Sequence, residues 1–238
     1  MVNLPSKLMR KKIDKKLFKL LLVVVLIVIV LIFSVLLSQD ETNDLSSTKS
    51  MINSEIDTDL LLNDSLEEVV ITEGGTHVIS GTMSSGQIIV NSGDEDVTLV
   101  LNGVDITNDN GSAIYIKEAG DVLIELAEGS VNFLSQDGVD QYEEEKAVIY
   151  STSDLVIKGG LEAILTIESA VADGISSSDD LEIQNAEIIV NASDDGIRGK
   201  DSVLLSGANI TIVAGDDGIK STNEEDSSRG WITISEST

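Results

Sequence analysis

The chain has 238 residues, one proline, no cysteine and a formal net charge of −27. The lack of cysteine excludes disulfides, thiol catalysis, thiolate metal sites and lipoprotein attachment, and the one histidine, His77, supports neither a poly-His zinc site nor a Ser-His-Asp triad. Such an acidic surface disfavours binding to nucleic acid and predicts cations as partners.

The N-terminal region combines a basic segment with a long apolar run. Residues 1–38 contain seven of the 15 Lys and Arg and one of the 42 Asp and Glu, which leaves residues 39–238 with a net charge of −33. The run at 20–37, LLLVVVLIVIVLIFSVLL, is long enough to span a hydrocarbon core at about 1.5 Å per residue. A cleaved signal peptide is the alternative, but the run exceeds a usual h-region and lacks a small-x-small cleavage pattern. We expect a cytoplasmic segment at 1–19, a transmembrane signal-anchor at 20–37 and an extracellular acidic domain at the cell membrane.

The next part of the chain changes from a polar spacer to strand patterns. Residues 38–66 are acidic and rich in Ser, Asn and Asp, which predicts a flexible linker. Short apolar runs typical of strands then follow at 69–71, 77–79 and 87–90, and glycines separate them. We expect these strands to cap the open end of a solenoid domain that spans residues 67–238.

Strand patterns continue through the middle of the chain, at 97–101, 104–106, 113–116, 121–124 and 147–150. They resemble less regular coils of the same solenoid. The intervening segment 136–146, QDGVDQYEEEK, is acidic and has no periodicity, so we expect an excursion loop there.

The tripeptide Asp-Gly-Ile recurs three times at a fixed interval of 22 residues. It begins at Asp173, Asp195 and Asp217, and an extra acid, Asp194 or Asp216, precedes the second and third copies. Six apolar positions recur at the same interval, since Leu181, Ile183, Ala186, Ile188, Val190 and Ile197 align with Val203, Leu205, Ala208, Ile210, Ile212 and Ile219. A leucine-rich repeat would need a Leu/Asn consensus and helical segments. We therefore expect an all-β, right-handed parallel β-helix with about 22 residues per coil.

A last strand pattern covers residues 231–234 and begins at Trp231. No cap is evident after it. We expect either a fragment of a longer protein or a natural truncation.

The repeated aspartates form a candidate metal site. Coils of a β-helix lie about 4.8 Å apart, and two carboxylates at that distance repel by roughly 3 kcal/mol at an effective dielectric of about 20. Ca²⁺, with six to eight oxygen ligands in flexible geometry, relieves such repulsion. The candidate ligands are Asp173, Asp194, Asp195, Asp216 and Asp217, and the weaker ones are Asp179, Asp180 and Asp201. The alternative is that Asp-Gly forms tight turns whose acids face solvent.

Basic residues are rare in the acidic domain, yet three of them, Arg198, Lys200 and Lys220, follow copies of the tripeptide. Beside a calcium ion they can bind a sugar carboxylate or act as the base of a β-elimination, or they can simply pair with neighbouring aspartates. Trp231 can stack on a sugar ring or form a partly buried residue of the last coil. We assign these four residues to ligand binding and none to catalysis.

Several stretches resemble a known family. They are VTLVLNGVDITN (97–108), SAIYIKEAGDVLIEL (112–126), DDGIRGKDSVLLSGANITIVAGDDGIKS (194–221) and RGWITI (229–234). These stretches are similar to the bacterial carbohydrate-binding domain-containing proteins, and the resemblance covers about residues 69–238. It implies a surface-attached, calcium-containing parallel β-helix that resembles pectate lyases in fold and binds cellulose or acidic pectic chains. Members are often lipoproteins and usually longer, and this chain departs from both patterns.

Three functions are compatible with these features. The one we favour is a non-catalytic, calcium-dependent polysaccharide-binding module on the cell surface, because no dedicated base is identifiable. The first alternative is a pectate-type lyase that acts by calcium-assisted β-elimination, although a fold does not specify an activity. The second is a structural or adhesive stalk that calcium stiffens.

Overall fold

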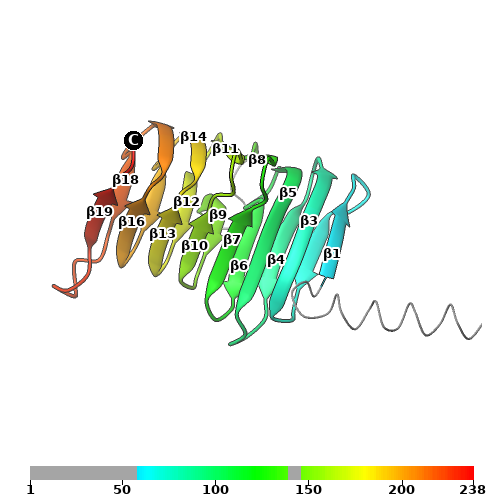
Figure 1. The fold of residues 1–238 in the computed structure, drawn as a ribbon, viewed down its shortest axis with the longest axis horizontal. Coiled ribbons are helices and arrows are strands. Elements are labelled where there is room, and N and C mark those ends of the chain that lie inside the picture. The colour runs from blue at the N-terminus through cyan, green and yellow to red at the C-terminus, as the bar shows by residue number, and fades with distance from the viewer. Residues whose placement is uncertain (1–57, 139–145) are drawn as a thin grey trace, which may run out of the picture. The chain divides into compact units, whose positions relative to one another are not determined.

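The computed structural model describes residues 58–138 and 146–238 (Figure 1). The expected cytoplasmic segment, the signal-anchor at 20–37, most of the linker and the centre of the excursion loop lie outside these residues. The described residues form strands and turns. None of their elements is a helix that could cross a membrane.

The strands are short and follow one another through tight turns. In chain order they are β1 (Thr58–Leu62), β2 (Glu68–Ile71), β3 (Gly75–Met83), β4 (Gln87–Asn91), β5 (Val97–Asn108), β6 (Ile114–Glu118), β7 (Val122–Leu126), β8 (Val131–Gln136), β9 (Ala147–Ser151), β10 (Leu155–Lys158), β11 (Ile164–Ser169), β12 (Asp173–Ser177), β13 (Asp180–Gln184), β14 (Glu187–Ala192), β15 (Ile197–Gly199), β16 (Ser202–Ser206), β17 (Asn209–Ala214), β18 (Ile219–Ser221) and β19 (Trp231–Ser235).

These strands stack into a parallel β-solenoid of about seven coils (Figure 1). A seven-stranded sheet takes one strand from each coil, in the order β18-β15-β12-β9-β6-β4-β2. The other faces form one 12-stranded sheet, because the long strands β3 and β5 each continue from one face to the next. Neighbouring coils therefore join through parallel strand pairs on every face, which confirms the predicted all-β parallel β-helix. The right-handed sense of the β-helix stays a prediction.

The predicted register of the regular coils is confirmed. Leu181 pairs with Val203, Ile188 with Ile210, and Ile197 with Ile219. The coil before them is longer by four residues, since Ile149 pairs with Ile175: three of the extra residues lie in the turn between β10 and β11 and one lies between β11 and β12. Insertions are accommodated at turns because the strands must keep their stacking.

One strand was not expected. β1 falls inside the segment 38–66 that we assigned to a flexible linker, and it pairs with β3 through Leu60 and Ile79 and through Leu62 and Gly81. Leu62 is buried in the core. The short Leu cluster supplies enough apolar surface to add a strand even though the flanking sequence is polar.

The core consists of columns of equivalent apolar residues along the solenoid axis. One column on the seven-stranded sheet contains Ile88, Ile114, Ile149, Ile175 and Ile197, all fully buried. Burial of one such side chain contributes about 1.5–3 kcal/mol. The columns therefore hold the coils together, and the residues between them and at the turns are free to carry function.

Candidate functional site

The aspartates of the Asp-Gly-Ile copies join successive coils through hydrogen bonds. The amide of Asp195 donates to Oδ1 of Asp173 at 3.1 Å, and the amide of Asp217 donates to Oδ1 of Asp195 at 3.0 Å. Asp173 and Asp195 are only 1% and 2% exposed. Each carboxylate thus satisfies a backbone donor of the next coil, which explains an acid at this buried position.

Basic residues neutralise the second oxygen of these same carboxylates. Nη2 of Arg198 lies 3.2 Å from Oδ2 of Asp173, and Nζ of Lys220 lies 3.2 Å from Oδ2 of Asp195. Lys220 also approaches Asp217 at 3.0 Å and Asp216 at 3.5 Å. The relief of repulsion that we expected from calcium is therefore supplied at Asp173 and Asp195 by side chains of the next coil.

Asp173 is the most perturbed carboxyl in this region. Burial raises its pKa from the usual 3.8 to about 6, although the charge of Arg198 acts in the opposite direction. Its Oδ2 receives no hydrogen bond in the described structure, because the guanidinium is close but not aligned with it. The ion pair only partly compensates the loss of hydration.

This raised pKa predicts that protein stability falls as the pH rises from about 4 to about 6. In this range the folded state still holds a proton on Asp173, whereas the unfolded state has already lost it. The stabilisation by this proton is therefore fully present below pH 3.8 and disappears as the pH rises past the folded-state pKa of about 6. Asp173→Asn keeps an oxygen for the Asp195 amide and does not titrate. Thermal melts between pH 4 and 7 should therefore show a smaller decline for this variant. An unchanged slope, or an equal loss of slope in the exposed control Asp194→Asn, would contradict this.

Three aspartates at the second and third Asp-Gly-Ile copies form one candidate cation cluster. Carboxylate oxygens of Asp194, Asp195 and Asp216 all lie within 4.8 Å of one another, and the two outer acids are exposed. However, Nζ of Lys220 contacts both Asp195 and Asp216. A calcium ion at this cluster would have to displace the ammonium group.

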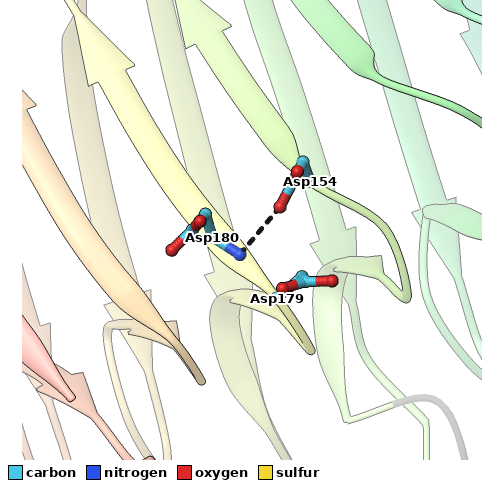
Figure 2. A group of neighbouring side chains, drawn as sticks. All are labelled: Asp154, Asp179 and Asp180. Carbon is cyan, nitrogen blue, oxygen red and sulfur yellow. Dashed lines mark hydrogen bonds between the residues drawn. The ribbon is translucent and has the colours of Figure 1, made fainter. Parts of the chain in front are cut away.

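A second acidic cluster lies on the other sheet, where β10 and β13 begin (Figure 2). Oxygens of Asp154, Asp179 and Asp180 lie within 4.8 Å of one another, and the amide of Asp180 donates to Oδ1 of Asp154 at 3.1 Å. Burial, followed by the charge of Asp154, raises the pKa of Asp179. In the described part of the chain, Asp154 and Asp180 belong to none of the ion pairs, and only Asp179 is near a basic group, Arg229 at 3.5 Å.

This second cluster continues into a column of acids that precede successive strands. Four strands, β5, β7, β10 and β13, pair with one another through equivalent apolar residues near their starts. An acid stands directly before each of these residues, namely Asp96, Asp121, Asp154 and Asp180. The amide of Asp121 donates to Oδ1 of Asp96 at 2.9 Å, as in the pair of Figure 2. A hollow in the surface is lined by Asp121, Asp154, Asp180 and Glu182 and by the apolar residues between them.

Our sequence analysis missed Asp96, Asp121 and Asp154 and gave Asp180 little weight. The acids are separated by 25, 33 and 26 residues because the turns of these coils differ in length, so they share no fixed period. A signal was nevertheless present: each acid precedes an apolar-x-apolar strand start, as in DVTL, DVLI, DLVI and DLEI.

Calcium fits the chemistry of the second cluster better than that of the first. Its carboxylates are hard oxygen donors, no basic group pairs with Asp154 or Asp180 in the described structure, and Asp179 is approached only by Arg229 at 3.5 Å; backbone carbonyls of the turns can complete the shell. Oδ1 of Asp180 accepts a hydrogen bond from the Ser202 hydroxyl at 2.6 Å, which holds its carboxylate in place. Asp154, Asp179 and Asp180 are therefore the residues that would hold the ion.

The four residues assigned to ligand binding lie at different places. Arg198 and Lys220 are register neighbours on the seven-stranded sheet and are partly exposed. Lys200 is exposed in the following turn. Trp231 begins β19 on the other sheet, pairs with Ser202 and is 44% exposed. The fold therefore places Arg198 and Lys220 side by side on neighbouring strands and places Trp231 on the other sheet.

Arg198 and Lys220 extend a column that also contains two aromatic residues. Tyr115 pairs with Tyr150, Tyr150 with Ser176, and Ser176 with Arg198. The two tyrosine rings stack with centroids 5.8 Å apart, and the Tyr150 hydroxyl lies 2.9 Å from the Ser178 hydroxyl. Aromatic and cationic side chains thus follow one another along one sheet.

Comparison with known proteins gives the wider context of this solenoid. A relative from Acetivibrio thermocellus described as a carbohydrate-binding domain-containing protein is 42% identical over 137 residues, which cover 55% of this chain. The match takes in 47% of the relative, so the chain spans about half of the relative's length. The solved structure of a polysaccharide lyase-like protein from C. thermocellum, a gadolinium derivative, superposes with a TM-score of 0.69 at 38% identity and covers 74% of this chain and 78% of that chain.

One further match covers enough of the chain to show its family. A sequence model of the carbohydrate-binding domain-containing proteins matches residues 65–238, which is nearly the whole described solenoid. The resemblance found in the sequence is thereby confirmed, and the chain belongs to the family of carbohydrate-binding domain-containing proteins.

Proposed function

We propose that the chain is a non-catalytic, calcium-dependent polysaccharide-binding module displayed on the cell surface. The observation that carries this proposal is the family match, because it coincides with the solenoid rather than with a separate part of the chain. The ligand is then bound by the solenoid surface, since its interior is filled by apolar side chains.

The partly exposed members of this column, Tyr150, Arg198 and Lys220, form the surface that suits a glycan, whereas Ser176 between them is buried. Its side chains recur at the coil spacing of about 4.8 Å, close to the repeat of one sugar in an extended polysaccharide. Tyr150 offers a ring for stacking, and Arg198 keeps donors beyond those used for Asp173 and Ser176. Lys200 lies next to this column and has an exposed side chain.

Calcium supports the binding of an acidic chain in particular. The domain is strongly acidic, so a pectic polysaccharide approaches a surface of its own sign. A cation held by Asp154, Asp179 and Asp180 would lower this repulsion and can share ligands with a sugar carboxylate. Cellulose carries no charge, and its binding would depend less on the ion.

Display on the cell surface follows from the N-terminal sequence. The apolar run at 20–37 would serve as the anchor, and the seven preceding basic residues favour a cytoplasmic N-terminus. The solenoid then lies outside the cell, where polysaccharides occur.

Retention on polysaccharides tests the proposed function. The full chain in detergent should be retained on insoluble polygalacturonate with calcium, and chelator should release it. Lys200→Ala should weaken retention by up to about fivefold, the equivalent of about 1 kcal/mol for an exposed charge contact. Lys158→Ala, an exposed lysine on β10, should leave it unchanged. Calcium-dependent melting without retention on polygalacturonate or cellulose would instead indicate a stiffened stalk.

A lyase is the second candidate, because the similar solved structure is described as polysaccharide lyase-like. In the described structure, two of its three candidate bases, Lys220 and Arg198, form ion pairs. Hydrogen bonds to Asp217 and then Asp195 raise the pKa of Lys220, so it stays protonated, whereas a general base must lose its proton near the working pH. Arg198 is held in its ion pair. We therefore expect no absorbance of unsaturated uronate during the retention experiment, and its appearance would contradict a purely binding role.

A further inference from the structure

The turn between β10 and β11, residues 159–163, forms one wall of a surface hollow. It is three residues longer than the equivalent turns of the next two coils, and these shorter turns line the rest of the hollow with residues 185–187, Gly207 and Asn209. The volume of the hollow is about 400 Å³, which is within the range of ligand sites. We call it the corner hollow, because it lies where the chain passes between two faces of the 12-stranded sheet.

Backbone hydrogen bonds on both sides hold this wall in place. The amide of Gly159 donates to the carbonyl of Gln184 in the following coil at 2.9 Å. The carbonyl of Leu161 accepts from the amide of Gly129 in the preceding coil at 2.8 Å. The side chains of the wall are therefore carried on a backbone that is fixed before any ligand arrives, which lowers the cost of binding.

Two exposed side chains of the wall stand beside the corner hollow. Leu161 is 71% exposed and presents an apolar surface. Glu162 is exposed as well, and in the described structure its carboxylate takes part in no hydrogen bond or ion pair. An apolar surface and two available acceptor oxygens thus lie next to each other.

Glu162 is an unusual residue for its backbone conformation. It stands two residues before Ile164, and the φ angles at the equivalent position of successive coils are all positive: 68° at Gly129, 57° at Glu162, 48° at Asn185 and 63° at Gly207. Glycine and asparagine adopt this left-handed conformation readily, whereas a glutamate is strained in it. Strained exposed residues concentrate at functional sites, so Glu162 is a candidate for function.

The rest of the lining is polar and contains no basic residue. Asn185, Glu187 and Asn209 are exposed there. Oδ1 of Asn209 accepts from the Thr238 hydroxyl at 3.1 Å, which leaves its amide group available as a donor. Amides that donate and carboxylates that accept match the hydroxyl groups of a sugar, which do both. The two glutamates would repel an anionic ligand.

We propose that the corner hollow is a binding subsite for neutral polysaccharide, in which Leu161 packs against the C–H face of a sugar ring and Glu162 accepts from its hydroxyls. This inference rests on the proposed function and divides it between two surfaces. Acidic chains bind at the column of Tyr150, Arg198 and Lys220 on the seven-stranded sheet, and neutral chains bind at the corner hollow. A neutral chain needs no cation there, because it brings no charge that the glutamates repel.

Retention on amorphous cellulose tests the subsite. The full chain in detergent should be retained equally with calcium and with chelator. Leu161→Ala and Glu162→Gly should each weaken this retention by about fivefold, through the loss of one apolar contact and of one charged acceptor. Both variants should keep the retention of the original chain on polygalacturonate with calcium.

Glu162→Gly also has a readout in stability. Glycine relieves the strain of the positive φ, so the variant should melt roughly 1–4 °C above the original chain, and weaker retention then does not result from unfolding. Glu236→Gly is the matched control, because Glu236 is exposed and has a φ of 52° but does not line the corner hollow. It should also melt higher, and its retention on cellulose should not change.

Four results would overturn the subsite. One is equal retention of the original chain and both wall variants on cellulose. Another is an equal loss on cellulose and on polygalacturonate, because the corner hollow would then not select neutral chains. A lower melting temperature of Glu162→Gly would show that the glutamate serves the fold. Retention of the original chain on polygalacturonate alone would remove the subsite and leave the proposed function, whereas retention on neither would remove both.

Discussion

Replacement of Gly196 by alanine is expected to lower the melting temperature by roughly 6–12 °C. The new Cβ would lie 2.5 Å from Cγ2 of Ile212 and 2.6 Å from the carbonyl oxygen of Gly218, so the backbone of the next coil must move. Overpacking of this kind costs about 3 kcal/mol in a closely packed interior. A domain of this size loses about 2–4 °C per kcal/mol, and circular dichroism melts would measure the shift.

The solenoid provides a matched control for this substitution. Gly218→Ala makes the same chemical change at the equivalent position one coil later, where no described atom lies within 4 Å of the new Cβ. It should leave the melting temperature within about 1 °C, since the loss of glycine's freedom in the unfolded chain even favours the variant slightly. Equal destabilisation by both substitutions would mean that glycine is needed for its own conformation and not for the stacking of coils.

Saturating calcium is expected to raise the melting temperature by roughly 5–10 °C, and Asp154→Asn with Asp180→Asn is expected to abolish that rise. At a calcium concentration of 100 times Kd, binding stabilises the folded state by about 2.7 kcal/mol. Both substitutions keep the oxygens that accept from the Asp180 amide and the Ser202 hydroxyl, so the local hydrogen bonds survive. They remove two of the three charges on which the ion depends. Calorimetry with and without chelator measures the difference.

The other acidic cluster serves as the control for the calcium experiment. Asp194→Asn with Asp216→Asn removes two exposed charges from the cluster that already contains the Lys220 ammonium. This pair should keep the calcium-induced rise. If it loses the rise and the Asp154/Asp180 pair keeps it, the ion lies at the Asp-Gly-Ile copies, and our assignment of the ligands is wrong.

Much of the fold could be predicted because a solenoid repeats its core at a constant interval wherever its turns have constant length. The pairs Leu181 with Val203 and Ile188 with Ile210 followed from the 22-residue interval and are confirmed. Strand patterns alone located β4, β9 and β19. β1 was missed because a short Leu cluster in a polar segment becomes a strand only when β3 is there to pair with it.

The candidate site depended more on the tertiary structure. The sequence placed Asp173 and Asp195 at one coil position and Arg198 and Lys220 at another. It left their roles open between metal binding, ligand binding and charge pairing. The contacts at 3.2 Å show charge pairing at Asp173 and Asp195, because each cation reaches back to the preceding coil; metal and ligand binding there stay predictions. Such a contact depends on side-chain direction, which spacing does not give.

The sequence by itself determined the repeat, its register and the acidity of its surface, since these depend on composition and on periods of two and 22 residues. Only the tertiary structure brought Asp154 beside Asp179 and Asp180, because the coils between the strand-start acids differ in length. It alone also showed that Gly174 and Gly196 are covered by the next coil and that Gly218 is not. Close approaches between coils are set by stacking in space, so no local pattern encodes them.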